Sequence, residues 1–470
     1  MSNSLGERVK IIATIGPASV APSVLKSLLV EGVDAIRINA SHAPPESIGD
    51  WVAKIRRASR TARREVAIML DLQGIKHRIG ALDEPMELVE GARVVLSPRR
   101  GPGKIPVKLG EFGKHIKPGL AIFLHDGFLR LRVDRVRGSE VDCTVILGGP
   151  LKSRAGFNVP GVPVTSRIPT RQDLKHIEAG VAAGVDIFAL SFVRDAKDVD
   201  RTRARTAGIP IIAKIERPEA VHNIDEVARA SDGLLVARGD LAVEMEPEQL
   251  PVLQKTLVVA GNRARKPVII ATEMLGSMVH NPRPTRAELT DVGNAVLDGA
   301  DATLLSDETA IGSDPARAVR FMARILRTVE RALGAYDVSL PLPRGGKASR
   351  PDWAIADAAV EVAAKVHACA IIAMTGSGRT ARLISASRPS VPLFTYSPDA
   401  AVRRRISILW GVNARPVSPM SDQERLIAKV LRDLGKEGHV TSGERVVIVL
   451  GSPVWAEGTK TNTVRVEVVP

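Results

Sequence analysis

The chain has 470 residues, which allows about three domains at roughly 150 residues each. A composition of 44% hydrophobic and 25% charged residues excludes a disordered chain. The two cysteines, Cys143 and Cys369, lie far apart, so the sequence predicts no disulfide framework and favours a reducing compartment. It contains neither an apolar run of about 18 residues nor a hydrophobic leader, and we therefore expect a cytoplasmic protein with no membrane contact.

The charge is basic, with 66 Lys and Arg residues against 52 Asp and Glu residues and a net charge of +14. This balance favours anionic partners, either nucleic acids or small phosphates and carboxylates. The basic residues are dispersed, and the densest stretch, 54–64, is typical of a helix with a solvated basic face, so we expect no nucleic-acid partner. Many charges combined with few Asn and Gln residues are typical of thermophilic proteins.

Eight short apolar runs alternate with amphipathic stretches, the pattern of repeated βα units. The predicted strands are 9–15, 34–39, 65–71, 186–192, 210–215, 233–238, 267–272 and 301–306. Between them, a cap at Thr170 opens a helix that ends near Gly184, and Pro218 opens another that ends before Asp232. The count predicts an α/β fold, a (β/α)8 barrel. A doubly wound sheet is the alternative, although no Gly-x-Gly-x-x-Gly follows any of these strands.

Two regions depart from this alternation of strands and helices. Between 74 and 167 there is no long helical pattern, and short strands at 87–89, 93–96, 121–124, 129–136 and 141–147 predict an inserted β domain. A Pro/Gly-rich linker at 340–347 precedes an open α/β unit with helices at 353–367 and 379–387 and strands at 370–374, 391–395 and 445–450. The expected segments are barrel (1–73), lid (74–166), barrel (167–338) and C-terminal domain (339–470).

Polar residues follow seven consecutive predicted barrel strands. Active sites of such barrels form at the C-terminal strand ends, so this concentration predicts a functional site rather than a series of structural caps. In chain order the residues are Arg37, Asn39, Ser41 and His42; Asp71; Ser191; Lys214 and Glu216; Arg238, Gly239 and Asp240; Thr272 and Glu273; and Ser306, Asp307 and Glu308.

The residue types in this set point to phosphoryl chemistry. Glu216 and Asp240 can hold a hard divalent cation such as Mg2+ while leaving positions for substrate oxygens. Lys214 lies two residues from Glu216 and points to the same side of its strand, where it suits the charge of a transferring phosphoryl group. Arg37 adds a planar fork for phosphate, and the backbone near Gly239 can approach a carboxylate at the start of a helix. The expected substrate is small and carries both phosphate and carboxylate.

The chain resembles a known family along essentially its whole length. The most specific segments are 10–17 (KIIATIGP), 37–42 (RINASH), 212–216 (IAKIE), 232–240 (DGLLVARGD), 281–288 (NPRPTRAE), 294–301 (NAVLDGAD) and 305–310 (LSDETA). In these segments the sequence resembles the pyruvate kinase family. The resemblance implies a (β/α)8 barrel with an inserted small β-barrel lid and a C-terminal effector domain, usually assembled as a homotetramer. It also implies transfer of the phosphoryl group of phosphoenolpyruvate to ADP, giving pyruvate and ATP in the last step of glycolysis.

The resemblance further implies roles for single residues. The metal ligands, for Mg2+ or Mn2+, would be Glu216 and Asp240, and a second Mg2+ would arrive with ADP. The phosphoryl group would be held by Lys214, Arg37 and Ser191, and the substrate carboxylate by Gly239, Asp240 and Thr272. Thr272 would also lie where a proton reaches the enolate, and the nucleotide phosphates would meet Asn39, His42 and Arg78.

Some positions depart from the family pattern. Ala155 stands where many relatives carry a lysine that contacts the nucleotide, and Arg154 or Lys152 is expected to replace it. Glu273 replaces a common Gln and Asp307 a common Gly, and neither has a physical explanation.

A Gly-rich turn in the C-terminal unit suits a phosphate, because it follows an apolar strand and opens a helix. The expected contacts are Thr375, Ser377, Gly378, Arg379 and Thr380. The resemblance implies a phosphorylated allosteric effector here. Relatives that respond to fructose 1,6-bisphosphate carry a basic residue where this chain has Trp455, so strong activation by that sugar is not expected.

The resemblance also bears on potassium. Many relatives hold K+ with residues that match Asn39, Ser41, Asp71 and the Leu72 carbonyl, and carry a Glu where this chain has Lys76. Members that need no K+ carry Lys there, and a tethered ammonium can replace a monovalent ion. The enzyme is therefore expected to work without K+. The alternative is that Lys76 is a solvated residue of the lid hinge.

Two other functions use some of the same features. A Mg2+-dependent aldolase acting on pyruvate enolate would need the carboxylate pair and an arginine, but it has no phosphoryl group to bind with Lys214 or Arg78. A non-catalytic protein that binds RNA through its basic surface would show salt-sensitive binding and no turnover.

Overall fold

The computed structural model describes residues 7–75, 77–109, 113–162, 166–333, 350–455 and 458–470. Eight strands, all paired in parallel, close into a barrel in the order β1-β16-β15-β14-β13-β12-β3-β2. Their bounds are β1 Lys10–Thr14, β2 Ala35–Asn39, β3 Ala67–Asp71, β12 Ile187–Leu190, β13 Ile211–Ile215, β14 Gly233–Ala237, β15 Val268–Ala271 and β16 Ala302–Leu305. The predicted barrel is confirmed.

Several strands begin one residue later than predicted. In three of them the residue before the strand is an aspartate whose side chain accepts a hydrogen bond from a neighbouring strand. Asp34, Asp186 and Asp301 precede β2, β12 and β16, and their carboxylates accept the backbone N–H of Ile11, Ile68 and Val268 at 2.8–3.0 Å. Each one therefore caps a neighbouring strand at the N-terminal rim of the barrel instead of extending its own strand.

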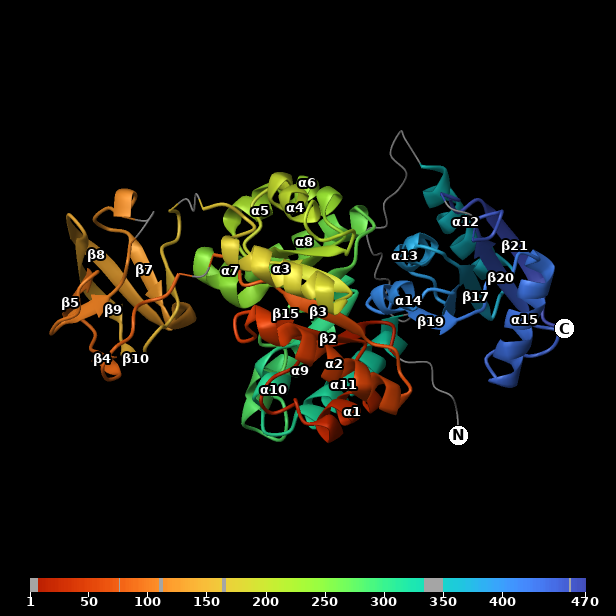
Figure 1. Cartoon of the computed structure of the whole chain (residues 1–470), viewed down its shortest axis with the longest axis horizontal. Helices are drawn as coiled ribbons and strands as arrows, with labels where there is room; N and C mark the ends of the chain where they lie inside the picture. Colours follow the sequence, from red (N-terminus) through yellow and green to blue (C-terminus); the bar gives the residue numbers. More distant parts are fainter. Residues whose placement is uncertain (1–6, 76, 110–112, 163–165, 334–349, 456–457) are drawn as a thin grey trace.

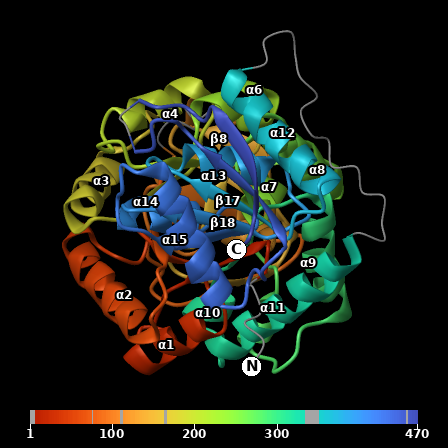
Figure 2. The ribbon, with the colours of Figure 1, turned by 90° about the vertical axis from the view of Figure 1, so that its right-hand side faces the viewer.

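Helices surround the barrel in a ring (Figure 2). They are α1 Pro22–Val30, α2 Ile48–Ala62, α3 Arg171–Ala183, α4 Ala196–Arg203, α5 Pro218–His222, α6 Ile224–Ala230, α7 Arg238–Glu244, α8 Leu250–Arg263, α9 Arg286–Asp298, α10 Asp307–Ala310 and α11 Pro315–Ala332. The predicted cap is present: the Thr170 side chain and Asp173 form a capping box, and Gly184 closes α3 with a φ of 73°. The single helix predicted from Pro218 is wrong, because the chain breaks at Asn223 into α5 and α6.

The insertion after β3 is a separate β unit with its own buried core. Its strands are β4 Met86–Leu88, β5 Arg93–Ser97, β6 Lys104–Pro106, β7 Ala121–Leu124, β8 Leu129–Arg137, β9 Glu140–Leu147, β10 Gly149–Leu151 and β11 Phe157–Asn158. They form a six-stranded sheet, β11-β7-β8-β9-β5-β6, and a two-stranded sheet, β10-β4. The prediction missed β6, β10 and β11, which have only two or three residues each.

The C-terminal unit is an open sheet in the order β19-β18-β17-β20-β21, with β21 antiparallel to β20. Its strands are β17 Ala370–Met374, β18 Leu393–Ser397, β19 Val412–Pro416, β20 Arg445–Leu450 and β21 Thr463–Val468, and its helices are α12 Pro351–Lys365, α13 Arg379–Ala386, α14 Ala400–Ile406 and α15 Gln423–Lys436. The lid and this unit lie on opposite sides of the barrel (Figure 1). The predicted linker at 340–347 lies outside the described residues. In the described part of the chain, no helix has the length and apolarity to cross a membrane.

Candidate active site

A cavity of about 90 Å³ opens at the C-terminal ends of the barrel strands. It joins residues from β2, β3 and β13 and from the segments that follow β2, β3, β12, β13 and β14, so side chains as far apart in the chain as Arg37 and Asp240 meet there. The lining residues are Arg37, Asn39, Ser41, Asp71, Leu72, Gln73, Ser191, Phe192, Lys214, Glu216 and Asp240. Nine of them are predicted site residues, while Gln73 and Phe192 are not.

Arg37 is fixed on the floor of this cavity by two neighbours. Its Nε donates to Asp71 Oδ2 at 2.7 Å, and its Nη1 donates to Thr14 Oγ1 at 3.0 Å. Asp71 is almost fully buried. Burial would raise the pKa of Asp71, but Lys214 and Arg37 together hold it below its ordinary value. The carboxylate therefore stays ionised and orients both cations.

Lys214 lies at the centre of the cavity, with only 9% of the residue exposed. Its Nζ is 2.8 Å from Ser191 Oγ, 3.2 Å from Asp71 Oδ1 and 2.8 Å from Glu216 Oε1. Burial would lower the pKa of Lys214, but the two carboxylates raise it above its ordinary value. The ammonium is thus a permanent positive charge in a site largely closed to water.

Glu216 has the arrangement of a metal ligand that retains free coordination capacity. Oε2 accepts the backbone N–H of Phe192 at 2.7 Å, which fixes the carboxylate. Oε1 is buried and, beside its ion contact with Lys214, accepts no well-directed hydrogen bond from the described residues. Burial raises the pKa of Glu216 to about 7, with Lys214 opposing the rise and Asp240 adding to it. Two carboxylates this close call for a further positive charge.

The donor set fits Mg2+ held partly by substrate. Within the described residues, no group of three or more His, Cys, Asp or Glu side chains could hold a metal ion by itself. Mg2+ is commonly bound by one or two carboxylates together with substrate phosphates and water. Glu216 and Asp240 match that pattern, because both face the same small cavity beside Lys214 and Arg37.

Thr272 follows β15 in the left-handed backbone region, with a φ of 71°. A β-branched residue rarely adopts this conformation, and such strain is concentrated at functional sites. Its Oγ1 accepts the backbone N–H of Gly239, the second residue of α7, at 2.8 Å. The hydroxyl therefore lies beside the first turn of α7, next to Asp240.

Two predicted nucleotide contacts lie away from this cavity. His42 is exposed, on the turn after β2, and its backbone N–H donates to Asn39 O at 3.0 Å. Arg78 is exposed on the segment leading into the lid, and its Nη1 donates to the carbonyl of Arg154 at 3.0 Å. Neither residue is among the described ones that line the cavity.

Comparison with known proteins identifies the family. The sequence model of the pyruvate kinase barrel domain matches residues 6–319, and that of the pyruvate kinase alpha/beta domain matches residues 353–467. The chain belongs to the pyruvate kinase family.

Similar pyruvate kinases come from distant organisms. The chain is 38% identical to one from Agrobacterium vitis over 465 residues, covering 98% of both chains, and 38% identical to one from Thermococcus litoralis over 480 residues, covering 98% of this chain and 99% of the other. The crystal structure of a pyruvate kinase from Cryptosporidium parvum superposes with a TM-score of 0.90 at 33% identity, covering 99% of this chain and 96% of the other.

The positions that depart from the pyruvate kinase pattern fall into two kinds. Ala155 is buried in the lid core, and its carbonyl accepts the N–H of Ile79, whereas Lys152 and Arg154 beside it are exposed. Glu273 and Asp307 are exposed, and nothing in the structure explains either substitution.

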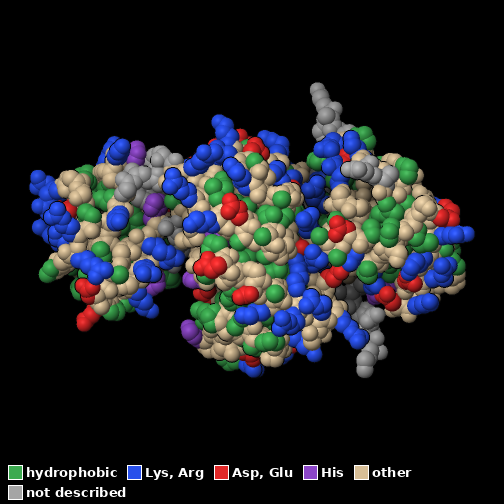
Figure 3. All heavy atoms as spheres, in the orientation of Figure 1, with side chains coloured by type: hydrophobic (Ala, Val, Ile, Leu, Met, Phe, Trp, Pro, Cys, Tyr) green, Lys and Arg blue, Asp and Glu red, His purple; other side chains and the backbone are tan. Residues whose placement is uncertain are grey.

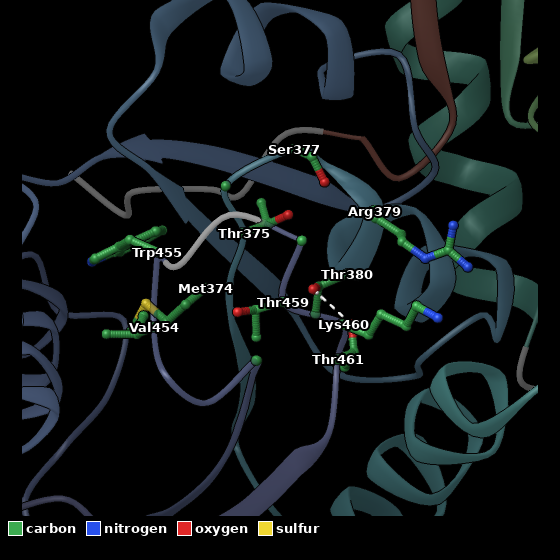
Figure 4. Close-up of a pocket in the computed structure, with 13 residues that line it drawn as sticks. Met374, Thr375, Ser377, Arg379, Thr380, Val454, Trp455, Thr459, Lys460 and Thr461 are labelled. Atoms are coloured by element: carbon green, nitrogen blue, oxygen red, sulfur yellow. Dashed lines mark hydrogen bonds between the residues drawn. The ribbon is translucent and has the colours of Figure 1, made fainter.

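The Gly-rich turn of the C-terminal unit borders a larger cavity of about 570 Å³ (Figure 4). Thr375, Ser377, Arg379 and Thr380 line it, as predicted, while Gly378 lies behind the turn, its N–H donating to Thr375 Oγ1 at 2.9 Å. The Thr380 and Thr461 hydroxyls are bonded to each other at 2.8 Å. The cavity is also lined by Trp455 on one side and by Lys460, close to Thr380, on the other (Figure 4).

Thr14 contacts the site but is not among the residues predicted from the sequence. This residue ends β1 and reaches Arg37 directly, and its own hydroxyl donates to Leu305 O at 2.8 Å. The signal was present, because Thr14 is the polar residue at the end of the first barrel strand, the one strand end that was left out of the predicted set.

Proposed function

We propose that the enzyme transfers the phosphoryl group of phosphoenolpyruvate to ADP, giving pyruvate and ATP in the last step of glycolysis. The observation that carries this proposal is the environment of Lys214, a buried ammonium between two carboxylates and a hydroxyl in the cavity of a pyruvate kinase barrel. Such a fixed charge stabilises a phosphoryl group in flight without reorganising at the moment of reaction.

The other residues that contact the substrate fall into two groups, those that bind its phosphate and those that bind its carboxylate. Arg37, held by Asp71 and Thr14, and the Ser191 hydroxyl orient the phosphoryl group beside Lys214. Backbone N–H groups at Gly239 and Asp240 and the Thr272 hydroxyl are proposed to bind the substrate carboxylate at the first turn of α7, where the Gly239 N–H would exchange its present bond to Thr272 Oγ1 for the substrate. Thr272 is further proposed to lie beside the enolate carbon that takes up a proton once the bond between phosphorus and the enol oxygen has broken.

Glu216 and Asp240 would hold Mg2+, or Mn2+, at this site. The metal supplies positive charge that offsets the phosphoryl oxygens during transfer. The second Mg2+ is proposed to enter with ADP. Asn39, His42 and Arg78 are proposed to contact the nucleotide phosphates. Lys152 or Arg154 is proposed to replace the lid lysine that many relatives carry at the position of Ala155.

A coupled assay for pyruvate formed from phosphoenolpyruvate and ADP tests this function. Mg2+-dependent turnover that needs both substrates supports it. An aldolase would consume a pyruvate adduct without ADP, and an RNA-binding protein would show salt-sensitive binding and no turnover, so either result would replace the proposal.

We also propose that turnover requires no K+. The four residues matching a monovalent site, Asn39, Ser41, Asp71 and Leu72, line the catalytic cavity. Lys76, the proposed replacement charge, lies outside the described residues, so this part rests on the sequence alone. The rate at fixed ionic strength should be unchanged when tetramethylammonium replaces K+, and Lys76→Glu should create a K+ requirement. Activation of the parent enzyme by K+ beyond about tenfold would refute the idea.

The cavity at 375–380 is proposed to bind a phosphorylated allosteric effector. The Gly-rich turn offers backbone N–H groups, and Lys460 adds a cation to the lining of the cavity. Because Trp455 occupies the position of the basic residue in relatives that respond to fructose 1,6-bisphosphate, other sugar phosphates or nucleotides are expected to act more strongly. Ser377→Asp and Thr380→Asp should abolish the response; unchanged kinetics across a panel of such compounds would contradict it.

The remaining expectations stay predictions. We propose a homotetramer that works in the cytoplasm of a thermophilic organism, with the chain divided at 73, 166 and 338. Size-exclusion chromatography with light scattering tests the homotetramer. Thermal unfolding tests the thermophilic origin.

A further inference from the structure

A second cavity, of about 330 Å³, lies where the C-terminal unit meets the N-terminal rim of the barrel. One part of its wall is apolar, and the other part is basic. The apolar residues include Ile187, Pro210, Ile212, Pro267, Ile406 and Leu409, and the charged ones are Arg379, Arg382, Arg405 and Asp232. Lys and Arg side chains are visible on both sides of this junction (Figure 3). The cavity is large enough for a small metabolite.

Three consecutive arginines on α14 behave differently at this junction. Arg403 pairs with Glu65 at 2.8 Å, and Arg404 pairs with Asp186 at 2.9 Å, so both tie the C-terminal unit to the barrel. Arg405 lines the cavity, makes no ion pair with any described residue, and has a buried Nε without a hydrogen-bond partner there. Its side chain is therefore not used to hold the interface.

Arg382, on α13, likewise lacks an ion pair with any described residue. One turn earlier, Arg379 donates to Asp352 at 2.7 Å. Arg382 has no such carboxylate among the described residues, and its Nε is also buried and unpaired. Burial lowers the pKa of Arg382; the charge of Asp232 opposes this shift, and the charge of Arg379 adds to it. A buried donor that lacks an acceptor costs free energy, so two of them in one cavity require an explanation.

The nearest carboxylate does not balance these arginines. Asp232 pairs with Arg203 at 2.8 Å and accepts the backbone N–H of Ile211 at 2.9 Å. Lys266 lies next to Pro267 of the cavity wall and donates to the carbonyl of Ser231. Burial and the charge of Arg382 lower the pKa of Lys266 to about 8, and Arg203 and Arg379 add to this shift against the opposing charge of Asp232. The local field is thus positive.

We propose that this cavity is a binding site for a phosphate monoester, whose dianionic head is held by Arg382 and Arg405 and whose uncharged remainder packs on Ile187, Ile212 and Leu409. Two unpaired guanidinium groups match the charge of a phosphate monoester and can donate in pairs to its oxygens. The site is distinct from the cavity at 375–380, although Ser377 and Arg379 border both. It does not depend on the proposed reaction, because binding is measured without turnover.

The site also has a mechanical consequence. Its wall comes from the barrel on one side and from α13 and α14 on the other. A ligand that contacts both sides binds best when the two units have their present spacing, and it therefore stabilises that arrangement by linkage.

Calorimetric titration with phenyl phosphate tests the proposal, because this probe combines a phosphate monoester with an apolar ring. The full chain carries Thr380→Asp to block the cavity at 375–380, and any binding in the catalytic cavity is common to all variants. In this background, Arg382→Gln with Arg405→Gln should weaken binding at the new site by at least tenfold. The matched control, Arg404→Gln, removes an arginine of the same helix that pairs with Asp186. It should change the affinity by less than twofold, because Arg403 still ties α14 to Glu65 and keeps the spacing of the two units.

Three results would overturn the proposal: unchanged affinity in the double variant, equal loss in Arg404→Gln, or binding of phenylacetate as tightly as phenyl phosphate. Circular dichroism checks that each variant folds. If the double variant does not fold, crystals of the parent chain soaked in tungstate decide the question. Tungstate between Arg382 and Arg405 supports the site, and tungstate confined to the catalytic cavity or to 375–380 refutes it.

Discussion

The barrel has a cavity with cationic side chains at each end, and the cations are all paired in one cavity but not all in the other. At the C-terminal end, Arg37 is paired with Asp71, and Lys214 contacts both Asp71 and Glu216. At the N-terminal end, Arg382 and Arg405 have no carboxylate partner among the described residues. Both cavities are partly closed to water, so the difference does not come from exposure.

The pairing reflects what each cavity has to do. In the catalytic cavity, charge moves during the reaction, and carboxylates that fix the cations in advance avoid a reorganisation cost at that moment. They also supply the metal ligands. In the cavity between the units, an anion only has to be bound, and unpaired donors provide a larger gain when it arrives. In this molecule, cations paired with carboxylates thus belong to the proposed catalytic site, and cations without a carboxylate partner belong to the proposed anion-binding site.

The largest effect should come from removing the central cation of the paired site. Lys214→Met deletes the ammonium beside the transferring phosphoryl group, and we expect the turnover rate to fall by 10²–10³-fold or more, about 3–4 kcal/mol. Glu216→Gln should instead raise the Mg2+ concentration needed for half-maximal rate, and added Mg2+ should restore part of the activity. Steady-state rates over a Mg2+ series separate the two. Wild-type turnover in Lys214→Met would remove the basis of the assignment.

A smaller effect is expected at the unpaired site, on stability rather than on rate. The pKa of Lys266 falls from 10.5 in the unfolded chain to about 8 in the folded one. Between these values the unfolded chain holds a proton that the folded chain has released, so the free energy of unfolding rises with pH in this window. The gain is about 3 kcal/mol at 1.36 kcal/mol per pKa unit.

Lys266→Met removes this titration from both states. Denaturant unfolding in phosphate-free buffer should show the parent gaining stability over the variant by about 2–3 kcal/mol from pH 7.5 to 10.5. A constant difference across that range would mean that neither burial nor the surrounding positive charges lower the pKa of Lys266.

The sequence predicted the barrel well because its strands are buried on both faces and read as continuous apolar runs. The shortfalls have local causes. Asp34, Asp186 and Asp301 were assigned to strands because they adjoin apolar runs, whereas their carboxylates cap neighbouring strands. In the C-terminal unit, α14, β19, α15 and β21 were not predicted. In β19 and β21 few residues are buried, so their hydrophobic periodicity is weak.

Most of the predicted site residues at strand ends line the catalytic cavity, whereas residues that are brought together only in space were not predicted. Nothing in the chain near Arg405 distinguishes it from Arg403 and Arg404, because the distinction depends on which barrel residue lies opposite each side chain. Phe192 contributes a backbone N–H to Glu216, and a backbone contact leaves no mark on residue type.

The smallest effect is expected from removing the hydrogen bond between Arg37 and the uncharged side chain of Thr14 in the catalytic cavity. Thr14 Oγ1 accepts a hydrogen bond from Arg37 Nη1 at 3.0 Å, while Asp71 holds Nε of the same guanidinium. Thr14→Val keeps the shape but removes the acceptor, and the Leu305 carbonyl that loses its donor still has Thr309 at 3.3 Å. We expect the KM for phosphoenolpyruvate to rise about fivefold, about 1 kcal/mol, with little change in kcat, because the ion pair to Asp71 still directs Arg37. Thr14→Ser retains the hydroxyl and should behave as the parent enzyme; an equal defect in both variants would show that side-chain packing, not the hydrogen bond, orients Arg37.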